Sequence, residues 1–125
     1  MRVGRVLKML TEPSDVTGKL KVTGSYRSIA RPLEDELLRI AQEAVTNAMR
    51  HAACSQIEVT LTYEMKAFRL VMRDDGRGFD TRVAGPAGHF GLQGMRERAA
   101  KIHARLEVQS EAGKGTQVSL ELRLV

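Results

Sequence analysis

The chain of 125 residues is long enough for one domain with a hydrophobic core and too short for two. Hydrophobic residues make up 42% of the chain and charged residues 28%, proportions that exclude a disordered tail. The net charge of +5 raises the question of nucleic-acid binding, but the basic residues are spread out and aromatics make up only 4%, so we expect no direct contact with nucleic acid.

The first elements are predicted from short patterns. Residues 2–10 carry apolar residues at helical spacing and predict a short helix, which the turn-rich residues 11–18 would end. In residues 19–26, apolar residues alternate with lysines, as is typical of an edge strand. We expect residues 1–17 to be an N-terminal segment, such as the remnant of a linker or helix, and residues 18–125 to form the functional domain.

The longest helical pattern begins at Arg31 and Pro32 and runs to about Ala53. Two strands with alternating apolar and polar residues follow, then a long loop, a last helix and a final pair of strands. The expected ranges are 57–63 and 68–72 for the first two strands, 75–94 for the loop, 92–104 for the helix, and 106–110 and 116–124 for the last strands. These elements predict an α+β fold, a two-layer sandwich of one sheet covered on one side by helices.

One face of the long helix carries polar side chains that suit a metal and phosphate ligand. Glu43, Asn47, Arg50 and His51 lie at offsets of four, seven and eight residues, so they share a helix face. A carboxylate, an amide oxygen, a guanidinium and an imidazole are groups that can hold Mg²⁺ and a polyphosphate. A solvated helix face would explain any one such pair equally well, so this set is informative only together with the motifs that follow.

An acidic turn with two glycines follows the second strand of the middle pair. Asp74 ends an apolar strand, and Gly76 and Gly78 allow the backbone to turn sharply and to lie close to a flat ligand. A carboxylate fixed at that place can accept a hydrogen bond from an exocyclic amine such as adenine N6. An ordinary surface turn is the alternative interpretation.

Glycines also space the loop that precedes the last helix, where they occupy the positions of Gly85, Gly88, Gly91 and Gly94. Such a loop can change conformation, and the N–H groups at the start of a helix can hold phosphate. The spacings fit neither a Walker loop nor a Rossmann fingerprint. Residues 113–116, with the sequence GKGT, lie between two expected strands and predict a hairpin turn.

Four motifs occur in a fixed order along the chain, namely EAVTNAMRHA, DDGRGFD, GHFGLQGMRERA and GKGT. In this order they resemble the N box and the successive glycine boxes of the GHKL ATPases, and within that superfamily the sensor histidine kinases that pair with NarL-type response regulators. The resemblance covers roughly residues 18–125. It implies the Bergerat fold, a mixed sheet with helices on one face, which holds ATP and Mg²⁺ between helices under a flexible lid.

The resemblance assigns roles residue by residue. Asn47 matches the asparagine that coordinates magnesium, Arg50 a phosphate-contacting position, and His51 the next nucleotide-contacting position. Asp74 matches the aspartate that binds adenine. The other positions that match binding residues are Gly76 and Gly78 in the pocket, Gly88, Gly91, Leu92 and Gly94 in the lid, and Thr116 at the adenine end.

Glu43 stands where many histidine kinases have asparagine, whereas the suspected subfamily and the hydrolysing members of the superfamily have a carboxylate. In the hydrolysing members that carboxylate orients water, and in a kinase it could act on magnesium through water or position the site. We take Glu43 and Arg50 as the catalytic candidates and leave the role of Glu43 open.

The destination of the phosphate follows from the resemblance. The three histidines, His51, His89 and His103, do not lie on a helical hairpin that could present an acceptor. The implied partners are therefore a histidine-bearing dimerisation domain of the same kinase and a response regulator downstream. Two alternatives stay open: another GHKL ATPase or an anti-sigma serine kinase, and a non-catalytic, basic module that binds nucleic acid in a salt-dependent way.

No apolar run reaches the roughly 20 residues that span a bilayer. We therefore expect a cytoplasmic domain without membrane contact, in a parent protein that is free to carry a membrane anchor. The single cysteine, Cys54, excludes an internal disulfide, and we expect it to be a small buried or half-buried residue at the end of a helix.

Overall fold

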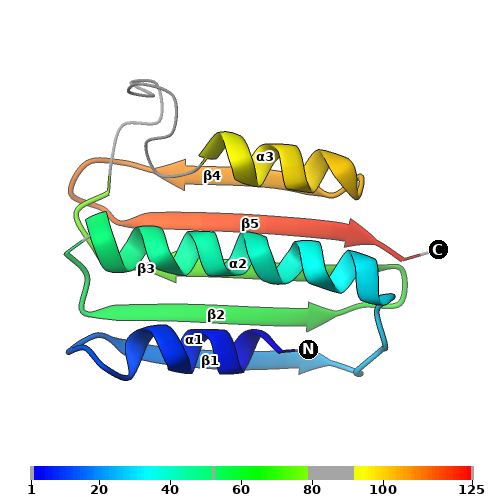
Figure 1. Ribbon diagram of the computed structural model, residues 1–125, viewed down its shortest axis with the longest axis horizontal. Coiled ribbons are helices and arrows are strands. Elements are labelled where there is room, and N and C mark those ends of the chain that lie inside the picture. The colour runs from blue at the N-terminus through cyan, green and yellow to red at the C-terminus, as the bar shows by residue number, and fades with distance from the viewer. Residues whose placement is uncertain (1, 52, 79–91, 125) are drawn as a thin grey trace.

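Five strands form one mixed sheet in the spatial order β1-β2-β3-β5-β4, and three helices lie on one face of it (Figure 1). The structure, a computed structural model, describes residues 2–51, 53–78 and 92–124. In chain order, the described elements are α1 (Val3–Thr11), β1 (Thr17–Gly24), α2 (Arg31–His51), β2 (Gln56–Tyr63), β3 (Ala67–Asp74), α3 (Leu92–Lys101), β4 (Arg105–Ser110) and β5 (Thr116–Arg123).

The strand directions follow from the connections between the strands. β1 and β2 are parallel because the chain crosses between them through α2, as a parallel pair requires. The other neighbouring strands are antiparallel, with short turns joining β2 to β3 and β4 to β5. β3 therefore lies in the middle of the sheet, and its last residue, Asp74, pairs with Ile57 of β2 and Thr116 of β5.

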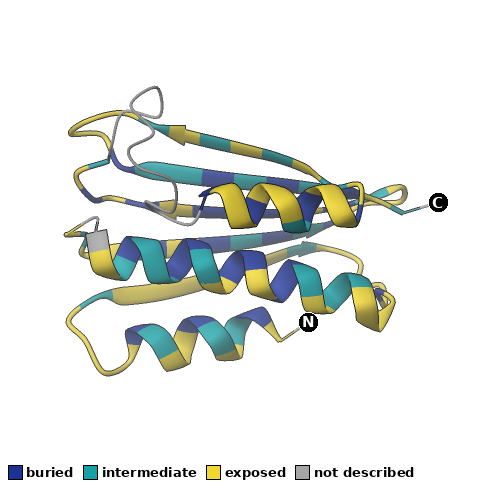
Figure 2. Cartoon of the chain, turned by 45° about the horizontal axis from the view of Figure 1, so that its top comes forward, coloured by how far each residue is buried: buried dark blue, intermediate teal, exposed yellow. Residues whose placement is uncertain are grey.

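The alternation of side chains gives the sheet one apolar face, which the helices cover. In β3, Phe68, Leu70 and Met72 are at most 1% exposed, whereas Arg69 and Arg73 between them are exposed. The same face buries Ile57, Val59, Leu61, Tyr63, Val118, Leu120 and Leu122. Buried residues lie along the central strands and on the sides of the helices that face them (Figure 2). Removing this apolar area from water stabilises the fold by roughly 25 cal/mol per Å².

α2 is 21 residues long and covers the centre of the sheet. Its residues in contact with the sheet recur three or four positions apart and are at most 2% exposed: Leu37, Ile40, Ala41, Ala44, Val45 and Ala48. Pro32 suits the first turn, where a missing N–H leaves no hydrogen bond unmade. The helix ends at His51 rather than at about Ala53, because Ala53 has a φ of 50°, outside the helical region. Cys54 just beyond is half-buried, as predicted.

α1 lies on β1 at one edge of the sheet and belongs to the core. Val3 and Leu7 are 1% and 3% exposed. The helix can approach the strand closely because Gly18 has no side chain: a Cβ atom there would lie 2.8 Å from Oγ1 of Thr11.

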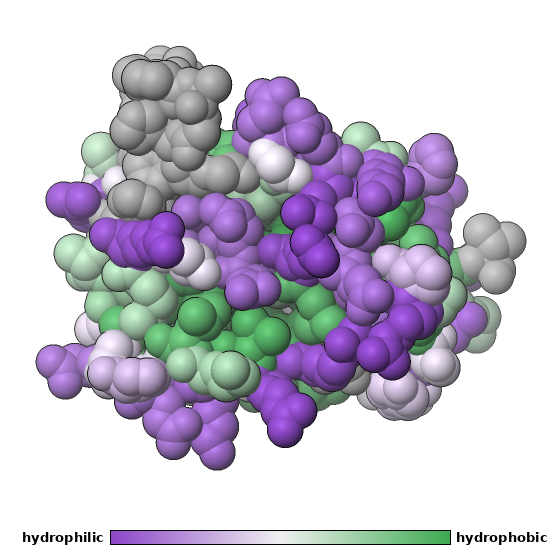
Figure 3. Space-filling model, viewed as in Figure 1, coloured by the Kyte–Doolittle hydropathy of each residue, from purple (hydrophilic) through white to green (hydrophobic). Residues whose placement is uncertain are grey.

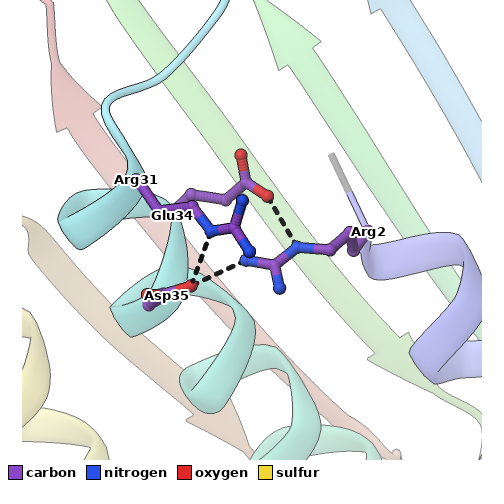
Figure 4. A network of polar contacts seen from close by, with 4 residues as sticks. All are labelled: Arg2, Arg31, Glu34 and Asp35. Atoms are coloured by element: carbon purple, nitrogen blue, oxygen red, sulfur yellow. Dashed lines mark hydrogen bonds and ion pairs between the residues drawn. The ribbon is translucent and has the colours of Figure 1, made fainter.

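Ion pairs join the start of α1 to the start of α2 (Figure 4). Nε of Arg2 donates to Oε1 of Glu34 at 2.9 Å, and its Nη2 donates to Oδ1 of Asp35 at 2.6 Å. Nε of Arg31 lies 3.7 Å from the same Asp35 oxygen. Exposed ion pairs of this kind contribute little to stability, so their main effect is to align the two helix starts.

The predicted α+β sandwich, with helices on one face of the sheet, is confirmed, and so is the mixed sheet that the family resemblance implied. The edge strand predicted at residues 19–26 is Thr17–Gly24 instead. The last helix ends at Lys101, three residues earlier than predicted, because the N–H of Ala104 returns to the carbonyl of Ala99 at 2.8 Å. Within the described ranges, no helix is both long and apolar enough to cross a membrane.

Replacing Leu7 by alanine is expected to lower the free energy of unfolding by about 2–5 kcal/mol, because the change leaves a cavity between α1 and the sheet. Met9→Ala is the matched control, since Met9 lies on the same helix but is 67% exposed; its effect should stay within about 0.5 kcal/mol. Denaturant unfolding followed by circular dichroism measures both values. Equal stability of the two variants would show that α1 does not unfold together with the sheet.

Candidate functional site

The carboxylate of Asp74 is buried at the end of the central strand. The residue is 4% exposed, and its Oδ1 accepts a hydrogen bond from the N–H of Gly76 at 2.8 Å. Burial raises the pKa of Asp74, and the backbone N–H groups of Gly76 and Thr116 oppose this rise because they stabilise the charged form. A carboxylate offers about four lone-pair positions, so Asp74 can accept a further hydrogen bond from a ligand.

The turn between β4 and β5 packs directly on the backbone around Asp74. The N–H of Gly113 donates to the carbonyl of Arg77 at 2.6 Å. Gly78 and Gly115 both have positive φ, and a Cβ atom on them would lie 2.1 and 2.3 Å from backbone oxygens of the facing segments. Only glycine fits such a conformation at such a distance, so the two glycines allow the turn and the acidic segment to lie against each other.

A cleft of about 510 Å³ opens beside Asp74, which is within the size range of small-molecule sites. The hydroxyls of Ser110 and Thr116 lie 2.8 Å apart in it, and the Ser110 hydroxyl also donates to the carbonyl of Gly115 at 3.2 Å. Thr116 is thereby held next to the carboxylate. The full lining consists of Arg73, Asp74, Val108, Gln109, Ser110, Glu111, Lys114, Gly115, Thr116 and Gln117.

A second cleft of about 510 Å³ lies between α2 and α3. Glu43 and Arg50 line it from α2, and Gly94 lines it from α3, together with Arg39, Gln42, Thr46, Met95 and Arg98. The surface over this region is hydrophilic, whereas apolar atoms gather between α1 and α2 (Figure 3). Three guanidinium groups against one carboxylate favour a polyanionic ligand.

The remaining predicted binding residues that the structure describes are not among those that line the two clefts. Asn47 is half-buried on α2 and does not line the cleft between α2 and α3. His51 is the last residue of α2, and its side chain lies outside the described part of the chain. Leu92 begins α3 and is 8% exposed. Gly88 and Gly91 lie outside the described residues.

Among the described residues, Asp74 and Thr116 line the first cleft, and Glu43, Arg50 and Gly94 line the second. Asp74, Gly76, Gly78 and Thr116 come together at the ends of β3 and β5, and Glu43, Arg50 and Gly94 come together between the helices. The chain between the two groups, residues 79–91, lies outside the described residues.

A magnesium ion in a nucleotide site is usually held by one or two protein oxygens together with phosphate oxygens. The amide of Asn47 and the carboxylate of Glu43 are oxygen donors of this kind, so the residues present fit such an ion. Among the residues that the structure describes, no three His, Cys, Asp or Glu side chains form a group that could hold a metal by themselves.

Sequence reasoning missed Asp75 and Ser110. Asp75 accepts hydrogen bonds from Ser55 and Gln56, twenty and nineteen residues away in the chain. The doubled aspartate at a strand end is the one signal that pointed there. The contact between Ser110 and Thr116 depends on the pairing of β4 with β5, which the pattern of either strand alone does not contain.

Comparison with known proteins identifies the class to which this fold and these clefts belong. The family model of the histidine kinase-, DNA gyrase B- and HSP90-like ATPases matches residues 33–125. The chain therefore belongs to this family of ATPases.

The curated relatives that it matches include sensor kinases. The chain is 36% identical over 111 residues to the sensor histidine kinase LiaS of Bacillus subtilis, covering 89% of this chain and 29% of that protein. It is 39% identical over 92 residues to the nitrate/nitrite sensor protein NarQ of Escherichia coli, covering 73% of this chain and 16% of that one. The chain thus spans less than a third of the length of these relatives.

Solved structures share the fold. The histidine kinase domain of a blue-light activated histidine kinase from Erythrobacter litoralis superposes with a TM-score of 0.80 at 19% identity, covering 98% of this chain and 59% of that one. The catalytic domain of histidine kinase ThkA gives a TM-score of 0.76 at 13% identity, covering 97% and 88%.

Gly115→Ala is expected to destabilise the protein more than Gly113→Ala. Both glycines have φ near +80°, so alanine at either incurs strain of roughly 1–2 kcal/mol. At Gly115 the new Cβ would also lie 2.3 Å from the carbonyl oxygen of Asp74, whereas nothing lies within 4 Å at Gly113. Overpacking should therefore add about 1–3 kcal/mol at Gly115 alone.

Thermal and denaturant unfolding of the two variants measure this difference, with the amide resonance of Gly76 as a local reporter. Similar losses of unfolding free energy in both variants would mean that the turn does not pack closely against the backbone at Asp74.

Proposed function

We propose that this chain is the ATP-binding catalytic domain of a sensor histidine kinase, which transfers the γ-phosphate of ATP to a histidine on a separate dimerisation domain of the same kinase. The buried carboxylate of Asp74 is the observation that carries this proposal. Asp74 is buried and accepts backbone N–H groups of Gly76 and Thr116, and its carboxylate keeps lone-pair positions for a further donor. The exocyclic amine of adenine is such a donor, which explains why this site selects an adenine nucleotide.

The adenine end of the site comprises residues from three segments. Asp74 would accept from the base. Gly76 donates its N–H to that carboxylate, and Gly78 would shape the pocket by letting the turn between β4 and β5 lie against the acidic segment. Thr116, held by the Ser110 hydroxyl, supports the same end. This arrangement follows from the sheet order, because β3 and β5 are neighbours there.

The phosphate end is assigned to the helix layer. Asn47 would hold Mg²⁺, Arg50 and His51 would contact phosphate oxygens, and Glu43 would position the reacting groups. Gly94 at the start of α3 and its neighbours Gly88, Gly91 and Leu92 would form the lid. Magnesium bound there supplies positive charge that neutralises phosphate oxygens.

Phosphoryl transfer requires positioning and charge neutralisation more than covalent chemistry from the protein. A nitrogen of the acceptor imidazole forms a bond to the γ-phosphorus as the bond from that phosphorus to the β,γ-bridging oxygen breaks, and ADP leaves. Arg50 would stabilise the charge that develops on the oxygens, because its guanidinium lines the cleft between α2 and α3.

The relatives support this assignment and its partners. They include sensor histidine kinases, a histidine-protein kinase/phosphatase and a nitrate/nitrite sensor. We propose accordingly that the phosphate passes from the histidine to a response regulator of the NarL type. The domain would act in the cytoplasm, attached to a parent protein that can be anchored in the membrane.

Asp74→Asn is expected to weaken ATP binding at least about 100-fold, or about 2.8 kcal/mol, because the amide replaces an acceptor oxygen by a donor. The variant should still fold, since asparagine has the same shape and can accept the Gly76 N–H. Isothermal titration calorimetry measures the affinity, and a thermal melt without nucleotide controls for folding. Unchanged affinity would remove adenine recognition from Asp74.

The transfer itself is tested by mixing the purified chain with a helical-hairpin fragment that carries the acceptor histidine and with γ-labelled ATP. We expect an acid-labile phosphohistidine on the fragment, which is absent when Asp74→Asn replaces the natural chain. Acid-stable label on serine would instead support a serine kinase. ATP turnover without the fragment, abolished by Glu43→Ala, would support a hydrolysing member of the family.

A further inference from the structure

The side chain of Asp75 accepts three hydrogen bonds although it lies at the surface. Its Oδ1 accepts the N–H of Ser55 at 2.8 Å and the N–H of Gln56 at 2.9 Å, and its Oδ2 accepts the Ser55 hydroxyl at 2.5 Å. These bonds lower the pKa of Asp75 to about 2, chiefly through the Ser55 hydroxyl, so the carboxylate is charged at neutral pH. Hydrogen bonds to a charged acceptor are roughly twice as strong as neutral ones.

The donors are Ser55, the last residue of the connection between α2 and β2, and Gln56, the first residue of β2. This connection is short: α2 ends at His51, and β2 begins at Gln56. Ala53 within it has a φ of 50°, a conformation that a residue with a side chain adopts only when its surroundings hold it there. The carbonyl of Ser55 also accepts the N–H of Thr17 at the start of β1. Ser55 thus joins the end of α2 to two strands.

Asp75 is the residue directly after Asp74, so its bonds hold Ser55 and Gln56 next to the buried carboxylate. The connection that contains Ser55 also contacts α2, because the Cys54 thiol donates to the carbonyl of Ala48 at 3.5 Å. The pairing of β2 with β3 would survive without Asp75, because Ile57 and Asp74 pair through the sheet. What Asp75 adds is the position of Ser55 and Gln56, and through them the direction of the last turns of α2. Those turns carry Asn47 and Arg50, the residues assigned to the phosphate end.

We infer that Asp75 is a positioning residue that fixes the phosphate-binding end of α2 relative to the adenine-binding carboxylate. This inference rests on the proposed function, since it concerns the same nucleotide. Asp75 itself does not contact the ligand. It acts through Ser55 and Gln56, so that one ATP molecule can meet Asp74 with its base and α2 with its phosphates at the same time.

If the hydrogen bonds of Asp75 contributed only to folding, its replacement would change the affinities for ATP and for adenosine alike. If Asp75 fixes the two ends of the site relative to each other, its loss must weaken a ligand that uses both ends and spare a ligand that uses one. ATP with Mg²⁺ uses both ends, and adenosine uses only the adenine end.

In Asp75→Ala, we expect the affinity for ATP with Mg²⁺ to fall about tenfold, while the affinity for adenosine changes less than about threefold. Asp75→Asn should restore ATP binding to within about threefold, because its amide oxygen can still accept both backbone N–H groups. Asp15→Ala is the matched control: it removes an exposed aspartate outside the site and should leave both affinities unchanged. Calorimetry measures ATP, and NMR titration measures adenosine.

Equal affinity of Asp75→Ala and the natural chain for ATP would overturn the inference, and so would equal losses for ATP and adenosine. Should Asp75→Ala fail to fold, Ser55→Ala serves in its place, because it removes only the 2.5 Å bond from the Ser55 hydroxyl to Asp75. We expect this variant to bind ATP about threefold more weakly and adenosine with unchanged affinity. Unchanged ATP affinity would overturn the inference. If the natural chain binds neither ligand, the proposed function fails and this inference falls with it. If the natural chain binds ATP and only the ordering of the variants is wrong, the inference alone fails.

Discussion

The burial of one carboxylate is the constraint on which the rest of this structure depends. Removing a carboxylate from water is costly unless donors replace the lost hydration. Here backbone N–H groups of Gly76 and Thr116 supply part of that replacement. They come from a turn after β3 and from the start of β5, so the carboxylate is tolerable only when the central strands pair in their observed register.

The sheet and the helix layer contribute different groups to the two clefts. The sheet supplies the buried carboxylate and the glycine-containing turn that lies against it, and the helices supply the guanidinium groups of the second cleft. α3 is held to α2 by Arg98 and Glu36, whose Nη1 and Oε1 atoms lie 3.5 Å apart. Backbone contacts are rigid and exclude side chains, whereas arginines on helices reach several positions. The cleft at the sheet is therefore built mainly on fixed backbone, and the cleft between the helices is lined by adaptable arginines.

Much of the fold could be predicted from the sequence because the signals are local. The alternation of apolar and polar residues over 116–124 predicts a strand with one buried face. In β5, Val118, Leu120 and Leu122 are buried on that face. The turn at residues 113–116 is the predicted hairpin. Asp74 could be located because an acidic residue ends a strand of alternating apolar residues just before two closely spaced glycines.

Other features could not be predicted because they depend on contacts between distant segments. The parallel pairing of β1 with β2 and the fit of α1 against Gly18 leave no periodic trace in either segment. The same holds for Asp75, whose partners lie some twenty residues away. On the long helix, the spacing predicts that Asn47 shares a face with Glu43. The cleft between α2 and α3 is lined by Glu43 and Arg50 but not by Asn47. The placement of the neighbouring helix decides which part of a helix face is enclosed, and spacing along one helix does not contain that information.

The central place of β3 has a consequence for how binding and unfolding are linked. β3 is hydrogen-bonded on both sides, so the buried carboxylate of Asp74 has this arrangement only while β2, β3 and β5 are assembled. A ligand that recognises it cannot bind a partly opened sheet. At a concentration one hundred times its dissociation constant, such a ligand would add about 2.7 kcal/mol to the opening of the whole sheet rather than to one loop. Amide hydrogens in the core strands, far from the ligand, would then exchange with solvent roughly a hundredfold more slowly.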